Sequence, residues 1–227
     1  MRTTPKLAAL GLLTAVASAT VAGQRLGRTA GSTCGERHAA LPGDDLVPDA
    51  TVVTDHAVDV AAAPADVWPW LTQMGWHRGG WYTPRWVDRL LFPANWPSAD
   101  RLEPELVRDL VPGDTIPDGP PGTAYFDVVV ADEPRVLVLR STTHVPTAWR
   151  ERYGARIDWT WTFVVTPQPG GCRVHLRVRG RTTPWWLTAA YVVALVPADY
   201  VMAMGMLHGL RDRAEPWAAE RSPAAAG

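Results

Sequence analysis

Two stretches near the C-terminal end of this 227-residue chain alternate between apolar and polar residues. In residues 157–166, Trp159 and Trp161 lie on the apolar side and Asp158 on the polar side, and residues 172–181 repeat the pattern with a row of arginines on the polar side. A period of two predicts antiparallel strands with one buried face. The rest of the chain must therefore supply a layer that covers the apolar side of this sheet.

Residues 184–214 provide such a layer. As a continuous helix with a rise of about 1.5 Å per residue they would extend roughly 45 Å, with an apolar first half and with Met202 on the apolar stripe of the second half. A membrane-spanning interpretation would place Pro197 and Asp199 inside the span, where an aspartate costs about 2.5 to 3.5 kcal/mol. The pattern favours a core helix clasped by the sheet, with Met202 facing the tryptophans of the concave side.

The remaining elements are shorter. Residues 52–60 alternate as a strand that carries His56 on its more apolar side, and Pro64 opens a short helix that Gly75 ends. Residues 75–121 are rich in proline and glycine, which indicates a loop with one helical piece. Further antiparallel strands, joined by tight turns, are expected at residues 124–131 and 135–141.

Composition excludes several classes of protein. The length suits one domain with appendages, and a net charge of -1 with a pI near 6.6 gives no basic surface for nucleic acid. The two cysteines, Cys34 and Cys172, define no disulfide framework, and two unpaired residues with Cys172 in the core are favoured over a pair. No histidine has metal-ligand spacing with cysteines or carboxylates, so neither a metal nor a cofactor is expected.

Residues 1–31 form a separate targeting or anchoring segment. Arg2 and Lys6 precede an uncharged run at residues 7–23, which contains a small-residue cleavage site at residues 17–19. A cleaved signal peptide and a retained membrane anchor both fit this pattern, and positive charges on both sides leave its orientation open. We therefore expect a protein that is either exported or membrane-associated through this segment.

Several short local motifs accompany this order of elements. They are Pro64-Ala65-Asp66-Val67-Trp68-Pro69-Trp70-Leu71, Gln73-Met74-Gly75, Arg78-Gly79-Gly80-Trp81-Tyr82, Ala99-Asp100-Arg101, Val111-Pro112-Gly113-Asp114 and the lead-in at residues 41–48. The order and the motifs together resemble the START-like, polyketide cyclase and pollen-allergen superfamily, known as SRPBCC, and within it a bacterial, largely uncharacterised branch. This resemblance implies an α+β helix-grip fold, in which a curved antiparallel sheet wraps around a long C-terminal helix and encloses an apolar cavity. It implies no activity, because the superfamily includes lipid carriers, aromatase/cyclases and ligand sensors.

The chain thus divides into four predicted parts. The helix-grip domain is expected to be monomeric and to hold its own core. The parts are a signal or anchor at residues 1–31, a linker at 32–50, the SRPBCC-like domain at 51–215 and a flexible tail at 216–227.

A polar and aromatic cluster follows Gly75, where the chain should leave the first domain helix near the mouth of the cavity. Trp81 and Tyr82 offer apolar contact and hydrogen bonds, and Arg78 could hold an anionic head group. The alternative is a structured loop in which Arg78 pairs with Asp100 or Glu103. The predicted ligand-binding residues are Trp159, Trp161, Tyr82, Trp81, Arg78 and Met202.

Catalytic signals are weaker. His56 with Tyr125 or Tyr82 could act as an acid–base pair, although a lone inward histidine is usually a hydrogen-bonded structural residue. Ser98 and Ser141 have no recognisable base partner in the sequence. The arginines of residues 172–181 indicate a solvated outer face, with binding of anionic lipid as the alternative.

We therefore expect this domain to bind a hydrophobic or amphipathic small molecule of lipid, polyketide or isoprenoid type rather than to act as an enzyme. Two alternatives remain: a polyketide cyclase or dehydratase that uses an inward histidine and tyrosine, and a structural or partner-binding domain without a cavity.

Overall fold

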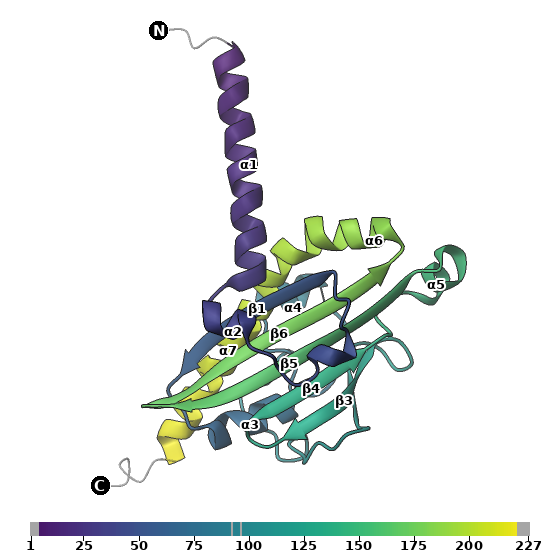
Figure 1. The fold of residues 1–227 in the computed structure, drawn as a ribbon. Helices are drawn as coiled ribbons and strands as arrows, with labels where there is room; N and C mark the ends of the chain where they lie inside the picture. The colour runs from purple at the N-terminus through teal and green to yellow at the C-terminus, as the bar shows by residue number, and fades with distance from the viewer. Residues whose placement is uncertain (1–4, 92, 96, 222–227) are drawn as a thin grey trace.

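The computed structural model describes residues 5–91, 93–95 and 97–221, and it confirms the α+β helix-grip fold. Six antiparallel strands form one curved sheet in the order β1-β6-β5-β4-β3-β2, and a long C-terminal helix crosses its concave face (Figure 1). The strands are β1 (Val52–Val60), β2 (Thr115–Pro117), β3 (Tyr125–Asp132), β4 (Val136–Ser141), β5 (Arg156–Gln168) and β6 (Gly171–Thr183). The helices are α1 (Pro5–Thr29), α2 (Cys34–His38), α3 (Pro64–Thr72), α4 (Arg85–Leu91), α5 (Thr147–Tyr153), α6 (Trp185–Ala190) and α7 (Val196–Arg221), with a 3-10 turn η1 (Asp44–Leu46) and a π-helical segment η2 (Tyr191–Leu195).

The core lies between the sheet and α7. Phe163 of β5 and Leu176 of β6 are opposite each other in the ladder and fully buried, as are Leu207 and Leu210 of α7. Alternation places these strand residues on the inner face, and the helical period places the two leucines on the side of α7 that meets it. The sheet and the final helix therefore bury each other's apolar faces.

The C-terminal helix is continuous but changes its winding at η2. The Val196 N–H donates to the Tyr191 carbonyl, five residues earlier, and Pro197 has no N–H to continue the ladder. Among the described residues, one helical run is long and apolar enough to cross a membrane: Trp185–Arg221, of whose most apolar 18 residues 28% are buried. Core helices of soluble proteins also meet this criterion, and α7 packs on the sheet. Residues 216–221, predicted as a tail, belong to α7.

The predicted linker, residues 32–50, covers the outer face of the sheet. In Figure 1 α2 and the loop after it lie across β6 and β5, on the face opposite α7. The segment begins with a capping box, in which Thr33 accepts from the Glu36 N–H and Glu36 accepts from the Thr33 N–H. Farther on, the Pro42 carbonyl accepts from the Thr162 hydroxyl at 3.1 Å. We call residues 31–49 the outer belt.

The arginines of β6 hold the outer belt, so the expectation of a solvated or lipid-binding stripe was wrong. Arg177 is buried and donates to the carboxylates of Asp55 and Asp44 and to the carbonyls of Glu36 and Ala39, at 2.7–2.9 Å. Along the same strand, Arg173 pairs with Glu36, His175 with Asp55 and Arg181 with Asp49. A buried guanidinium that makes several charge-assisted hydrogen bonds of this kind holds the segments that it contacts together.

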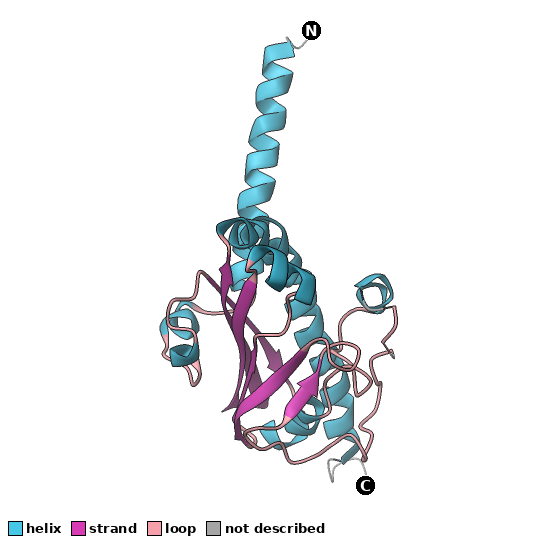
Figure 2. Cartoon of the chain, turned by 90° about the vertical axis from the view of Figure 1, so that its right-hand side faces the viewer, coloured by secondary structure: helices cyan, strands magenta, loops and turns pink. Residues whose placement is uncertain are grey.

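Helix α1 leaves one end of the domain, and only its last turns pack on it (Figures 1 and 2). Gly23 and Gly27, one turn apart, lie against Pro197 and Val196, and a Cβ on Gly27 would collide with the Val196 carbonyl. Gln24, between them, donates its side-chain amide to the Val192 carbonyl at 2.6 Å. This bond satisfies an acceptor in the turn where Pro197 offers no N–H.

Candidate functional site

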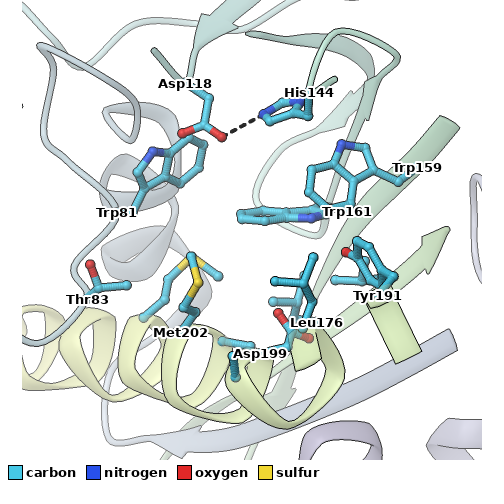
Figure 3. Close-up of a pocket in the computed structure, with 15 residues that line it drawn as sticks. Trp81, Thr83, Asp118, His144, Trp159, Trp161, Leu176, Tyr191, Asp199 and Met202 are labelled. Atoms are coloured by element: carbon cyan, nitrogen blue, oxygen red, sulfur yellow. Dashed lines mark hydrogen bonds and ion pairs between the residues drawn. The ribbon is translucent and has the colours of Figure 1, made fainter. Parts of the chain in front are cut away.

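A cavity of about 280 Å³ lies between the concave face of the sheet and α7 (Figure 3). Most of its walls are apolar, and its few polar groups come from the loop before α4, the loop before β3, the loop after β4, η2 and the first turn of α7. The lining residues are Trp81, Thr83, Asp118, His144, Trp159, Trp161, Leu176, Val178, Tyr191, Leu195, Ala198, Asp199, Met202, Ala203 and Met206.

Three tryptophans form one wall of the cavity. The ring centroids of Trp81 and Trp161 are 5.3 Å apart, and those of Trp159 and Trp161 are 6.3 Å apart. The indole nitrogens of all three are buried and have no hydrogen-bond partner among the described residues. Protein atoms cover these nitrogens, so the three tryptophans present their carbon atoms to the cavity and leave three buried donors unpaired.

The position of Trp81 depends on α7. Gly205 and Gly209 leave room for the chain at residues 82–84, and a Cβ on Gly209 would collide with the Tyr82 carbonyl. Tyr82 itself has a φ of 56°, which turns its side chain away from those of Trp81 and Thr83. Its hydroxyl donates to the Trp70 carbonyl at 2.8 Å and accepts from Gln73 at 3.0 Å. The left-handed turn at Tyr82 thus directs both of its neighbours into the cavity.

A chain of three polar side chains forms one end of the cavity. The Nε2 atom of His144 lies 2.7 Å from Asp118 Oδ2, and its Nδ1 atom lies 2.7 Å from the Ser141 hydroxyl (Figure 3 shows the first contact). Asp118 and His144 line the cavity, whereas Ser141 is buried behind them. Contrary to the sequence-based expectation, Ser141 therefore has a histidine partner, although the cavity lining does not include it.

Asp199, in the first turn of α7, forms a second polar group. Its Oδ2 atom accepts from the Thr54 hydroxyl at 3.1 Å and lies 3.5 Å from Nε2 of the fully buried His56. Close by, burial and the charge of Asp199 raise the pKa of the Tyr191 phenol well above its usual range, so Tyr191 stays a neutral hydroxyl. The cavity therefore carries two carboxylates, and its lining contains no arginine or lysine.

Four of the six predicted ligand-binding residues, Trp81, Trp159, Trp161 and Met202, lie on the cavity lining. Tyr82 and Arg78 do not. The Tyr82 hydroxyl bonds to residues of α3 and its C-terminal cap. Arg78 donates to the carbonyls of Thr72, Met74 and Leu106 instead of pairing with Asp100 or Glu103 as expected. These hydrogen bonds stabilise the conformation of the loop.

The proposed catalytic pair is not assembled. His56 lies on β1 and Tyr125 on β3, with β6, β5 and β4 between them, so their strands are roughly 19 Å apart at about 4.8 Å per strand. His56 contacts Asp199, and Tyr125 is partly exposed at the edge of the domain. Tyr82 does not reach the cavity either. The polar groups that sequence reasoning missed, Asp118, His144, Tyr191 and Asp199, carry no local motif, because the fold alone brings them together.

Both cysteines are free, Cys34 exposed and Cys172 buried. Within the described ranges, no group of three or more histidine, cysteine, aspartate or glutamate side chains could hold a metal ion.

Comparisons with known proteins give only distant likenesses. No family model matches the sequence, and no curated protein is significantly similar to it. Among solved structures, the chain is similar to the di-domain ARO/CYC StfQ of the steffimycin biosynthetic pathway (16% identity, TM-score 0.43, covering 78% of this chain and 55% of that one). It is also similar to CalU16 from Micromonospora echinospora (18% identity, TM-score 0.32, covering 74% of this chain and 85% of that one). A third similar structure is a Thalictrum norcoclaurine synthase point mutant (13% identity, TM-score 0.33, covering 69% of this chain and 95% of that one). Membership of the SRPBCC superfamily stays a prediction from the motifs.

Proposed function

We propose that the domain binds a neutral, mainly apolar small molecule that carries a hydroxyl group. The observation that carries this proposal is the apolar cavity lined by Trp81, Trp159 and Trp161, whose few polar groups include the carboxylates of Asp118 and Asp199. The tryptophan rings offer a ligand apolar and aromatic contact, and the carboxylates can accept a hydrogen bond.

The charge of the cavity argues for a neutral ligand. Asp118 and Asp199 line it without a balancing arginine or lysine, so a ligand carboxylate would meet two like charges in a poorly solvated space. A ligand hydroxyl could instead donate to the carboxylate of Asp118. Within the predicted class, this favours an isoprenoid alcohol or an aromatic polyketide over a free fatty acid.

The size of the cavity limits the ligand further. A volume of about 280 Å³ lies just below the roughly 300–1,000 Å³ that is typical of small-molecule sites. It suits one or two fused rings or a short chain, and it is too small for a whole phospholipid. The second alternative, a structural or partner-binding domain without a cavity, does not agree with this space.

The test compares dodecanol with dodecanoate, and farnesol with a hydroxylated aromatic polyketide, by calorimetry on the purified full-length protein. We expect the alcohol to bind more tightly than the carboxylate. Trp161→Phe shortens an aromatic side chain that lines the cavity, and should weaken binding about four- to fifteen-fold, the value of one or two buried methylene groups. Trp76→Phe is the matched control, because Trp76 is also buried but does not line the cavity. If none of these compounds bound, the proposal would be wrong.

Proton transfer is a second candidate function, favoured by the contacts around His144. Asp118 could accept a proton from a carbon next to a ligand carbonyl, while His144 holds the carboxylate in place. The same proton can return to the alkoxide formed in an aldol ring closure. Asp118→Asn should then abolish turnover of a polyketide-like substrate and His56→Ala should not; the reverse result would exclude Asp118 as the base.

We also propose that α1 is retained as a membrane anchor. Its last turns pack on α7 through Gly23 and Gly27, so they are part of the folded structure. Mass spectrometry of the protein from the membrane fraction should find residues 1–19 still attached. A mature chain that starts at Thr20 would show that the segment is a cleaved signal.

A further inference from the structure

An apolar surface without charged residues runs along α6 and η2. Trp185 is 80% exposed, Val193 72% and Leu195 50%, and Ala189 and Ala190 are exposed between them. Trp186 joins this surface to α5, since its ring packs edge-on against Trp149 and Tyr153, which are themselves exposed. We call these residues the α6 patch. Large exposed apolar patches of this kind mark interaction surfaces, and tryptophan and tyrosine are typical of the membrane–water interface.

The contact between α1 and η2 determines how far the α6 patch lies from the bilayer if α1 spans it. The uncharged run of α1 ends at Gly23, and the next residue, Gln24, is bonded to the Val192 carbonyl in η2. The run would extend about 25 Å along the helix, close to the thickness of the hydrocarbon core. If α1 spans the bilayer, Gln24 lies at its surface, and so does η2. In Figure 1 α6 runs crosswise to α1 near its base, in the orientation of a helix that lies flat on that surface.

Charged residues at the border of the α6 patch suit a lipid surface. Arg150 and Arg152 of α5, Arg156 at the start of β5, and Arg25 in α1 are all exposed, and they outnumber the exposed acidic residue between them, Glu151. Arginines around an apolar patch can reach phosphate groups while the aromatic residues enter the interface. These residues therefore favour a bilayer over a second protein.

We infer that the α6 patch docks on the surface of the bilayer that holds α1, and that ligand passes between this bilayer and the cavity beside η2. Tyr191 and Leu195 of η2 line the cavity, while Val193 points to the outside, so a single helix separates the cavity from the docked surface. The docking depends on α1 being an anchor, and the route of the ligand rests on the proposed binding function.

The experiment uses full-length protein in vesicles of phosphatidylcholine with roughly one-third phosphatidylglycerol. A fluorescent NBD probe is attached at Val193→Cys in a Cys34→Ser background, since Cys172 is buried. The matched control is Pro169→Cys in the exposed β5–β6 turn, at the other end of β6 and roughly 40 Å away at about 3.3 Å per residue. On reconstitution we expect a blue shift and protection from aqueous iodide at position 193 and neither at position 169.

Equal quenching of both probes would overturn the docking. The probe at position 193 could instead be shielded from iodide already in detergent, to a degree that rises with protein concentration. That result would show that a second copy of the protein covers the α6 patch, and it would also overturn the docking on the bilayer. Val193→Glu should slow transfer of labelled farnesol from vesicles several-fold and leave its affinity in detergent unchanged; an unchanged transfer rate would exclude the route beside η2. If no ligand binds while the 193 probe is protected, the binding function fails and the docking stands.

Discussion

Arg177 in β6 donates to Oδ1 of Asp55 on the neighbouring strand β1 at 2.8 Å, and both side chains are almost completely buried. The same oxygen of Asp55 lies 2.9 Å from His175. Because Arg177 also donates to Asp44 and to two carbonyls of the outer belt, this pair joins three separate stretches of chain. The ion pair is therefore the point at which the N-terminal segment is fixed to the sheet.

Loss of Arg177 should destabilise the domain strongly. Arg177→Ala leaves Asp55 as a buried charge with one fewer partner and leaves belt carbonyls without donors, so we expect a loss of about 3–5 kcal/mol in the free energy of unfolding. Arg181→Ala breaks an exposed pair with Asp49 and should cost less than about 1 kcal/mol. Urea denaturation of both variants measures the difference; equal effects would contradict the role given to Arg177.

Acid should weaken the attachment of the outer belt. Hydrogen bonding to Arg173 and the capping contacts with Thr33 lower the pKa of Glu36 to about 2. Because the folded-state pKa lies below the unfolded value, this stabilisation is complete above about pH 4.5 and is lost as the pH falls towards 2. It amounts to about 3 kcal/mol at most. Thermal melts from pH 7 to pH 2 should show a smaller acid loss in Glu36→Gln than in the wild type; parallel curves would count against this pair.

The joint between α1 and α7 should depend on the absence of a side chain at Gly27. Gly27→Leu would force α1 away from the Val196 carbonyl and break the bond from Gln24 to Val192, without touching the core of the domain. Limited proteolysis should then cut near residues 29–31 much faster. Ala22→Leu, five residues earlier on the exposed part of α1, is the control and should behave as the wild type.

The two cysteines should differ in reactivity. Burial raises the pKa of Cys172 to about 11, so very little thiolate is present at pH 8, whereas Cys34 is exposed. A maleimide should label one cysteine per native chain and two after unfolding in urea. Rapid labelling of both in the native protein would show that the buried end of β6 opens readily.

Periodic patterns made most of the fold predictable. The alternation around Trp159 and Trp161 and the apolar helix that contains Met202 led to the sheet, the final helix and one wall of the cavity. The outer belt was not predictable, because glycine, proline and aspartate in residues 32–50 indicate loops but do not say which surface a loop covers. The arginines of β6 were misread for the same reason, since their partners lie more than 120 residues away in the sequence.

The polar groups at one end of the cavity could not be predicted from the sequence for a different reason. Asp118 and His144 are 26 residues apart and belong to the loops before β3 and after β4, which the antiparallel pairing of these strands brings together. α5, which immediately follows them, was also missed, because a seven-residue helix between Pro146 and Gly154 has too few turns to show a period.

The outer belt also determines how the domain responds to mechanical force. A pull on α1 reaches Gly31, whose carbonyl is bonded to Arg173, and then residues 36–49, whose contacts with Arg177, Arg179 and Arg181 follow one another along β6. A pull on α1 first loads the contacts of Gln24 with Val192 and of Gly27 with Val196, beside the cavity. Once these contacts have opened, the force is applied along the row of belt contacts, which share the load in shear on the face of the sheet opposite the cavity.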